Sequence, residues 1–179
     1  TWSLVGSEMC IRDRHYVLTA SIHENVVSNW NWIEALIASV PIAILVMLIV
    51  WINQFQDAPS DAAVGKNTWV VRTAEKGEWM KLEKPLRLYK QFMIEAFVAV
   101  ALVGALSFFT DFGTVYAFMA LIPIALVWKA FKMADEWMTK WNNPNADRQK
   151  VPYELLLVNV STIGIHFLTG ILLAVAYIL

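Results

Sequence analysis

Four long apolar runs constrain the fold of this chain more than any other feature of its sequence. They cover residues 32–52, 92–110, 115–131 and 155–179. A helix needs about 20 mostly apolar residues to cross a bilayer core, and only a structure that satisfies its own backbone hydrogen bonds can cross it. We therefore predict an all-α, polytopic transmembrane helix bundle with about four spanning helices. The loops 53–91 and 132–154 join them, and Pro41 and Pro123 should kink the first and third helices.

Composition agrees with a membrane protein and excludes several other classes. The chain is 58% hydrophobic and only 16% charged, which lies outside the usual range of soluble domains. Its one cysteine, Cys10, cannot form a disulfide framework. No basic stripe with interleaved aromatic residues is present, so we expect the lipid bilayer as a partner and no nucleic acid.

The placement of lysine and arginine predicts the orientation of the bundle. Apart from Arg12 and Arg14, every basic residue lies within 66–90 or 129–150. Both stretches emerge on the same side if the four spans alternate in direction. By the positive-inside rule that side is cytoplasmic. We expect an integral protein of a prokaryotic plasma membrane, with both charged stretches in the cytoplasm.

The first 14 residues, TWSLVGSEMCIRDR, resemble translated sequencing-adapter sequence. We expect them to be a non-native head and exclude them from fold reasoning; the alternative is a natural polar tail. On the first interpretation, residues 15–179 are the C-terminal part of a longer protein. Residues 15–21 would then be a truncated helix stub, since they are too few to span a membrane.

Three oxygen-bearing side chains follow the first apolar run at intervals of four: Asn53, Asp57 and Asp61. On a helix, side chains with this spacing stack on one face, with neighbouring Cβ atoms roughly 5–6 Å apart. Carboxylate and amide oxygens suit Mg²⁺, which commonly takes one or two protein carboxylates and completes its shell with water and substrate phosphate. We call Asn53, Asp57 and Asp61 the acidic ladder. It predicts a magnesium site at the mouth of the bundle.

Cations that could hold a diphosphate follow the ladder. Gly65 allows a tight turn, after which Lys66 and Arg72 offer a point charge and a planar fork for phosphate oxygens. Pro59 interrupts the ladder, and we expect it to bend the helix or restart it. The plainer alternative is that these charges are solvated caps of a membrane span, with no ligand.

The segment from Trp51 to Arg72, which contains the ladder and the two cations, resembles the second aspartate motif of the UbiA superfamily of intramembrane aromatic prenyltransferases. Its closest similarity is to the dihydroxynaphthoate or hydroxybenzoate polyprenyltransferase type. The final apolar run is similar to that family's last helix, and the resemblance covers nearly all of 15–179. The matching features are Ile52-Asn53, Asp57, Asp61, Gly65-Lys66-Asn67-Thr68, Val71-Arg72, Asn159, Thr162, His166 and Gly170-Ile-Leu-Leu.

The resemblance implies Mg²⁺-dependent transfer of a prenyl group from a polyprenyl diphosphate to an aromatic quinone precursor. It implies that Asp57 and Asp61, assisted by Asn53, hold the metal and act in catalysis, while Lys66 and Arg72 bind diphosphate. It also implies that the four runs are the last four of nine helices. The family's first aspartate motif is absent here, so we expect the chain alone to be inactive.

Two further interpretations remain open. His166 lies within the last run, where an ionisable residue is a functional candidate, although a neutral histidine packed between helices is the commoner outcome. The whole chain could also belong to a non-enzymatic membrane subunit or a transporter. In that case, changing the acidic ladder should leave function intact.

Overall fold

The computed structural model describes residues 31–75, 80–110, 113–147 and 150–179. Residues Ala38–Leu179 form one compact unit, within which the helices pack against one another. The other unit, Thr1–Ile37, contributes only the first turns of helix α2 to the described residues. The predicted adapter-derived head and helix stub lie outside the described residues.

Regular structure in the described ranges is helical, apart from one isolated bridge between Glu75 and Lys81. The prediction of an all-α fold is therefore confirmed. In chain order the elements are α2 (Asn31–Ala63), α3 (Trp69–Thr73), α4 (Glu83–Leu106), η1 (Val115–Leu121), α5 (Ile124–Trp141), η2 (Val151–Leu155) and α6 (Leu156–Ala176).

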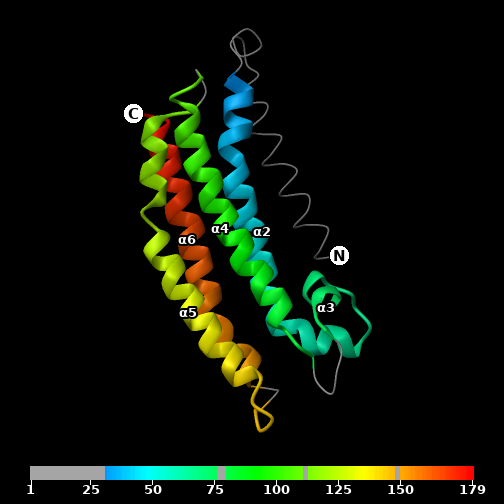
Figure 1. Cartoon of the computed structure of the whole chain (residues 1–179). Helices are drawn as coiled ribbons and strands as arrows, with labels where there is room; N and C mark the ends of the chain where they lie inside the picture. The colour runs from blue at the N-terminus through cyan, green and yellow to red at the C-terminus, as the bar shows by residue number, and fades with distance from the viewer. Residues whose placement is uncertain (1–30, 76–79, 111–112, 148–149) are drawn as a thin grey trace. The chain divides into compact units, whose positions relative to one another are not determined.

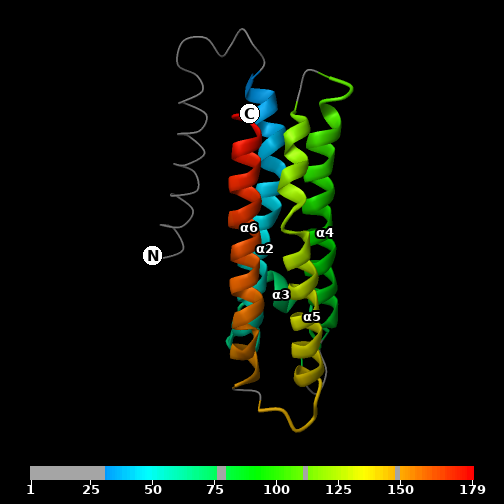
Figure 2. The same cartoon turned by 90° about the vertical axis from the view of Figure 1, so that its left-hand side faces the viewer.

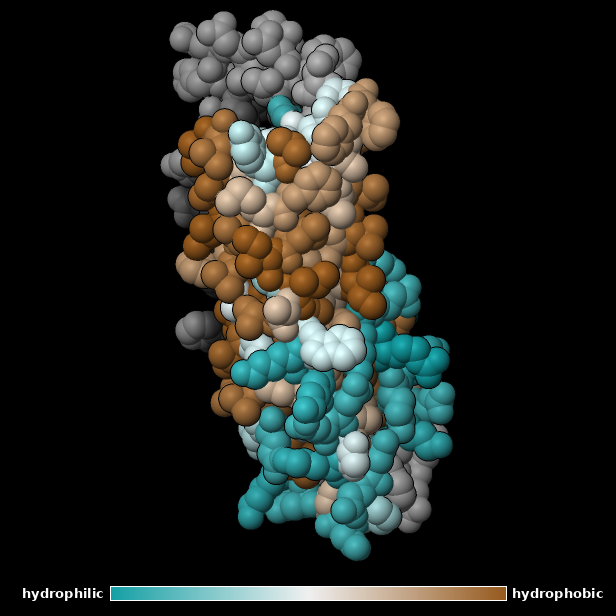
Figure 3. Space-filling model, turned by 60° about the vertical axis from the view of Figure 1, so that its left-hand side comes forward, coloured by the Kyte–Doolittle hydropathy of each residue, from teal (hydrophilic) through white to brown (hydrophobic). Residues whose placement is uncertain are grey.

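Four helical segments are long and apolar enough to cross a membrane, as the apolar runs predict. They are Ile33–Ala63, Glu83–Leu106, Val115–Trp141 and Val151–Ala176. Figure 3 shows a face on which hydrophobic residues occupy most of the surface and hydrophilic residues gather toward one end. This distribution fits an integral membrane protein with one charged end outside the hydrocarbon.

Within the compact unit, the long helices run alongside one another (Figures 1 and 2). The connection from α2 to α4, which contains α3, and the connection from α5 to α6 lie at the same end. The turn between α4 and η1 lies at the other end, near the C-terminus. The two basic stretches of the sequence thus share one end of the bundle.

Aromatic side chains join α2 to its neighbours at the charged end. Phe55 meets Trp137 of α5 edge-on, with ring centroids 6.0 Å apart. Trp51 packs against Phe92 of α4 at 6.0 Å and donates its indole N–H to the Pro85 carbonyl at 3.2 Å. A buried Trp N–H needs such a partner. These contacts hold the helix that carries the acidic ladder against the rest of the unit.

The helices extend beyond the apolar runs, which corrects the predicted boundaries. At the charged end, α2 continues past residue 52 to Ala63, α4 begins at Glu83, and α5 continues to Trp141. Much of the two predicted loops is therefore helical. The reason is that a helix depends on backbone hydrogen bonds, which do not stop where side chains become polar.

The prolines behave differently from one another. Pro123, where the sequence predicts a kink, lies between the 3-10 helix η1 and the α-helix α5 of the third span. Pro59, like Pro41, instead lies inside the continuous helix α2. The predicted restart at Pro59 is therefore wrong, whereas a bend at either proline stays a prediction. Pro59 removes one backbone donor, but the next turn closes normally, with the Val64 N–H donating to the Ser60 carbonyl at 3.2 Å.

Candidate functional site

The acidic ladder occupies the final turns of α2, at the charged end of the bundle. Asn53, Asp57 and Asp61 all belong to this one helix, because it runs through Pro59 without ending. Successive members are therefore one turn apart on a shared face, as the spacing predicts.

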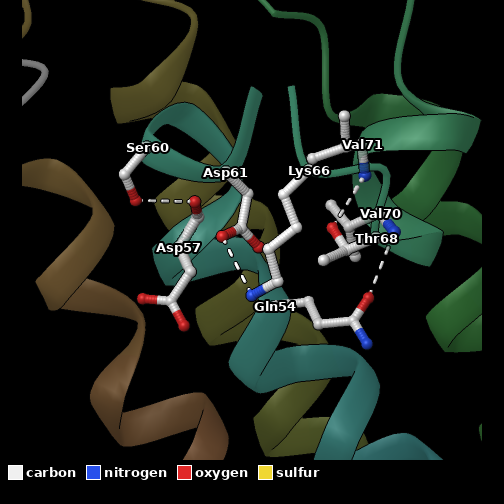
Figure 4. Close-up of polar contacts among 8 residues, drawn as sticks. All are labelled: Gln54, Asp57, Ser60, Asp61, Lys66, Thr68, Val70 and Val71. Carbon is white, nitrogen blue, oxygen red and sulfur yellow. Dashed lines mark hydrogen bonds and ion pairs between the residues drawn. The ribbon is translucent and has the colours of Figure 1, made fainter. Parts of the chain in front are cut away.

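The two carboxylates of the ladder have different surroundings. Asp61 is 8% exposed, and its Oδ1 lies 3.1 Å from Lys66 Nζ. Asp57 is exposed, and no described residue forms a hydrogen bond or ion pair with its carboxylate. The hydroxyl of Ser60 bonds to the backbone carbonyl of Asp57, at 2.9 Å, and not to its side chain (Figure 4).

The end of α2 explains why Lys66 reaches Asp61. Gly65 has φ +74°, a left-handed conformation that glycine adopts without a Cβ clash. The Lys66 N–H donates to the Asp61 carbonyl at 2.8 Å, and the Gly65 N–H donates to the Ala62 carbonyl at 3.2 Å. This pair of bonds is a Schellman motif. It turns the chain back so that the Lys66 ammonium lies beside the Asp61 carboxylate (Figure 4).

Helix α3 is hydrogen-bonded to α2 near the ladder, but its Arg72 side chain does not contact the ladder carboxylates. The Val70 N–H donates to Gln54 Oε1 at 3.3 Å, which ties the start of α3 to α2. The Arg72 guanidinium lies over the Trp69 ring, 5.8 Å from its centroid. Within the described ranges, no ion pair joins Arg72 to Asp57 or Asp61. Of the two predicted diphosphate-binding cations, the structure brings Lys66 alone into contact with the ladder.

Asn53 has a partner on the last helix of the chain. The Asn159 side-chain amide of α6 donates a short hydrogen bond to Asn53 Oδ1. Asn159 is 6% exposed, whereas Asn53 is exposed. The sequence directs attention to Asn159 only through the family resemblance, and that resemblance assigns it no role. Its proximity to the ladder depends on tertiary packing across 106 positions of sequence.

The donor chemistry of these residues fits magnesium. Among the described residues, no group of three or more His, Cys, Asp and Glu side chains could hold a metal ion. The ladder itself offers two carboxylates and one amide oxygen. Mg²⁺ commonly uses such a set when a substrate phosphate supplies further oxygens. The exposed Asp57 carboxylate, which has no partner in the part of the chain that the structure describes, is the feature that best matches this requirement.

His166 lies apart from the ladder along α6. It follows Asn159 by seven residues, which is a rise of about 10 Å in an α-helix. Its Nδ1 is buried without a hydrogen-bond partner in the described chain. No contact there joins His166 to Asn53, Asp57 or Asp61, so its candidacy stays a prediction.

Comparison with known proteins adds no further assignment to this geometry. No protein-family model, curated protein or solved structure matches the chain. The indications of function are therefore the residues of the ladder, their surroundings and the resemblance to the UbiA superfamily.

Proposed function

We propose that this chain contributes one magnesium diphosphate site to an intramembrane prenyltransferase. The observation that carries the proposal is the end of α2, at the charged end of a membrane bundle. An Asp57 carboxylate without a partner among the described residues lies there together with an Asp61–Lys66 ion pair. Oxygen ligands beside a cation suit a metal-bound phosphate ester. The resemblance of the segment to an aspartate motif of the UbiA superfamily supports the same function.

The proposed roles follow from the surroundings of each side chain. Asp57 and Asp61, with the Asn53 amide oxygen, would hold Mg²⁺. When bound, Mg²⁺ supplies positive charge that stabilises the diphosphate as a leaving group. The Lys66 side chain is 64% exposed, so its ion pair with Asp61 is worth about 1 kcal/mol or less. Lys66 can therefore exchange a carboxylate oxygen for a phosphate oxygen at little cost.

The reaction proposed is electrophilic prenyl transfer. The bond between the allylic carbon and the diphosphate oxygen breaks, and its electron pair leaves with the diphosphate. A new carbon–carbon bond forms to the aromatic acceptor, which then loses a proton. The apolar interior of the bundle would exclude water, so that the allylic cation reacts with the acceptor and is not hydrolysed.

Loss of either carboxylate provides the direct test. We expect Asp57→Asn and Asp61→Asn to lower Mg²⁺-dependent consumption of a polyprenyl diphosphate by about 100-fold or more, since each removes charge that is needed at the leaving group. Removal of Mg²⁺ by a chelator should have the same effect. The assay uses the full-length gene product in detergent or nanodiscs, with 4-hydroxybenzoate and 1,4-dihydroxy-2-naphthoate as trial acceptors. Asp147→Asn, in the α5–α6 connection, is the matched control.

The rival is a membrane subunit or transporter in which the ladder is only a solvated helix end. On that view the variants Asp57→Asn and Asp61→Asn would behave like Asp147→Asn. Full turnover in folded Asp57→Asn and Asp61→Asn proteins would exclude the prenyltransferase proposal.

A further inference from the structure

The hydrogen bond between α2 and α6 beside the acidic ladder joins two side chains of unequal freedom. Asn53 is exposed at the ladder, whereas Asn159 is buried in the bundle. The Asn159 nitrogen donates to Asn53 Oδ1, but the Asn159 oxygen is buried without a hydrogen-bond partner in the described chain. A buried amide that satisfies only one of its ends is costly in an apolar interior. Packing alone would favour an apolar residue at this position.

We propose that Asn159 is a positioning residue that orients the Asn53 amide for metal binding at the ladder. The inference rests on the proposed function and deepens it, since it assigns the last helix a part in the metal site. A carbonyl oxygen has two lone pairs. One accepts the hydrogen bond from Asn159, which leaves the other for a divalent cation.

The exposure of Asn53 explains why such help is needed. An exposed asparagine samples several rotamers, and a metal ligand loses that freedom when it binds. A fixed hydrogen bond from a buried donor removes much of this loss in advance. Partners that orient a metal ligand in this way typically change metal affinity by about 10-fold to 100-fold when they are removed.

A second contact, three residues further along α6, keeps the donor in place. The Thr162 hydroxyl lies 2.7 Å from the Tyr89 hydroxyl of α4, and neither residue is exposed. Helix α6 is thereby fixed to α4 within one turn of Asn159. Helix α4 in turn accepts the Trp51 indole N–H of α2 at the Pro85 carbonyl. The three helices thus set the position of Asn159 relative to Asn53.

The test measures metal binding directly. Binding of Mn²⁺ alone to the full-length protein is followed by the loss of the free Mn²⁺ EPR signal. We expect Asn159→Leu to raise the dissociation constant for Mn²⁺ about 10-fold. The same variant should not lower the thermal unfolding temperature, because it removes a half-satisfied buried amide. The control Gly113→Ala destabilises the turn after α4, at the other end of the bundle, where an added Cβ would lie 2.4 Å from the Val103 carbonyl oxygen. We expect it to lower the unfolding temperature and leave Mn²⁺ binding unchanged.

A double-mutant cycle gives a second, independent measurement. Because Asn159 acts through Asn53, we expect Asn53→Ala, an exposed change, to weaken Mn²⁺ binding by itself. Asn159→Leu should then weaken it no further. Unchanged binding in either single variant overturns the inference, as does an equal loss in Gly113→Ala.

The parent proposal fails separately. If Asp57→Asn binds Mn²⁺ as the unaltered protein does, the proposal of a magnesium site at the ladder is refuted. If Asp57→Asn abolishes binding and Asn159→Leu does not affect it, only the role of Asn159 is lost.

Discussion

At the residue scale, Asp57 and Asp61 show that two aspartates on neighbouring turns of one helix can have different surroundings. Asp61 is buried against the α2 C-terminus and already holds the Lys66 ammonium. Asp57 is exposed and has no such partner in the described chain. Spacing predicts that both lie on one face, but it cannot predict this difference. The difference comes from the turn at Gly65, whose two backbone bonds bring Lys66 back over one carboxylate only.

The buried pair Tyr89 and Thr162 yields a residue-scale prediction with a definite order. The Thr162 hydroxyl donates its one proton to the Val158 carbonyl at 2.8 Å, so Tyr89 must be the donor between the two hydroxyls. Thr162→Val strands the Tyr89 donor in the interior, which should lower the free energy of unfolding by about 1–2 kcal/mol. Tyr89→Phe leaves only an unused lone pair on Thr162 and should cost less than about 1 kcal/mol. Unfolding in mixed micelles measures both, and the reverse order would contradict this assignment of the donor.

At the element scale, the ends of the helices separate what sequence predicts from what it does not. The apolar runs predict the middle of each span, because length and hydropathy decide it. Helix ends depend on local backbone bonds, so α2 continues to Ala63 and α5 to Trp141 although their last turns are polar. The partner of Asn53 could not be predicted either, because it depends on how α6 packs against α2.

At three glycines we predict how substitution by alanine changes the free energy of unfolding. The three differ in backbone conformation and in the space available for a Cβ atom. Gly164 lies within α6 with open space where a Cβ would be, so Gly164→Ala should raise the free energy of unfolding by about 0.5–1 kcal/mol. Gly65 also has open space, but its φ is +74°, and Gly65→Ala should cost about 1 kcal/mol. Gly113 has φ +86°, and an added Cβ would lie 2.4 Å from the Val103 carbonyl oxygen. Gly113→Ala should therefore cost more than Gly65→Ala.

The same unfolding assay orders the three glycine variants. Gly164→Ala serves as the control for the substitution itself. Equal stabilities for Gly65→Ala and Gly113→Ala would show that the turn after α4 relaxes to admit a methyl group.

At the scale of the whole molecule, the four spans place both connections rich in lysine and arginine at one end of the bundle. The sequence alone predicts this arrangement, since alternation of four spans requires it. The number and direction of the spans do not predict how the helices pack against one another inside the bundle. Contacts such as Phe55 with Trp137 depend on which faces of the helices meet. The acidic ladder is thus predictable as a helix face, whereas its setting among α3, α4 and α6 is not.

The placement of lysine and arginine predicts which end of the bundle faces the cytoplasm, and labelling of single cysteines tests that prediction. The basic connections should stay in the cytoplasm, because translocating lysine and arginine near a span is unfavourable. In a Cys10→Ser background, we expect Asn145→Cys, in the α5–α6 connection, to react with a membrane-impermeant maleimide only in inside-out vesicles. Phe109→Cys, 86% exposed beyond α4 at the other end, should react in intact cells. The opposite pattern would place the acidic ladder outside the cytoplasm, away from cytosolic prenyl diphosphates, and would count against both the orientation and the proposed reaction.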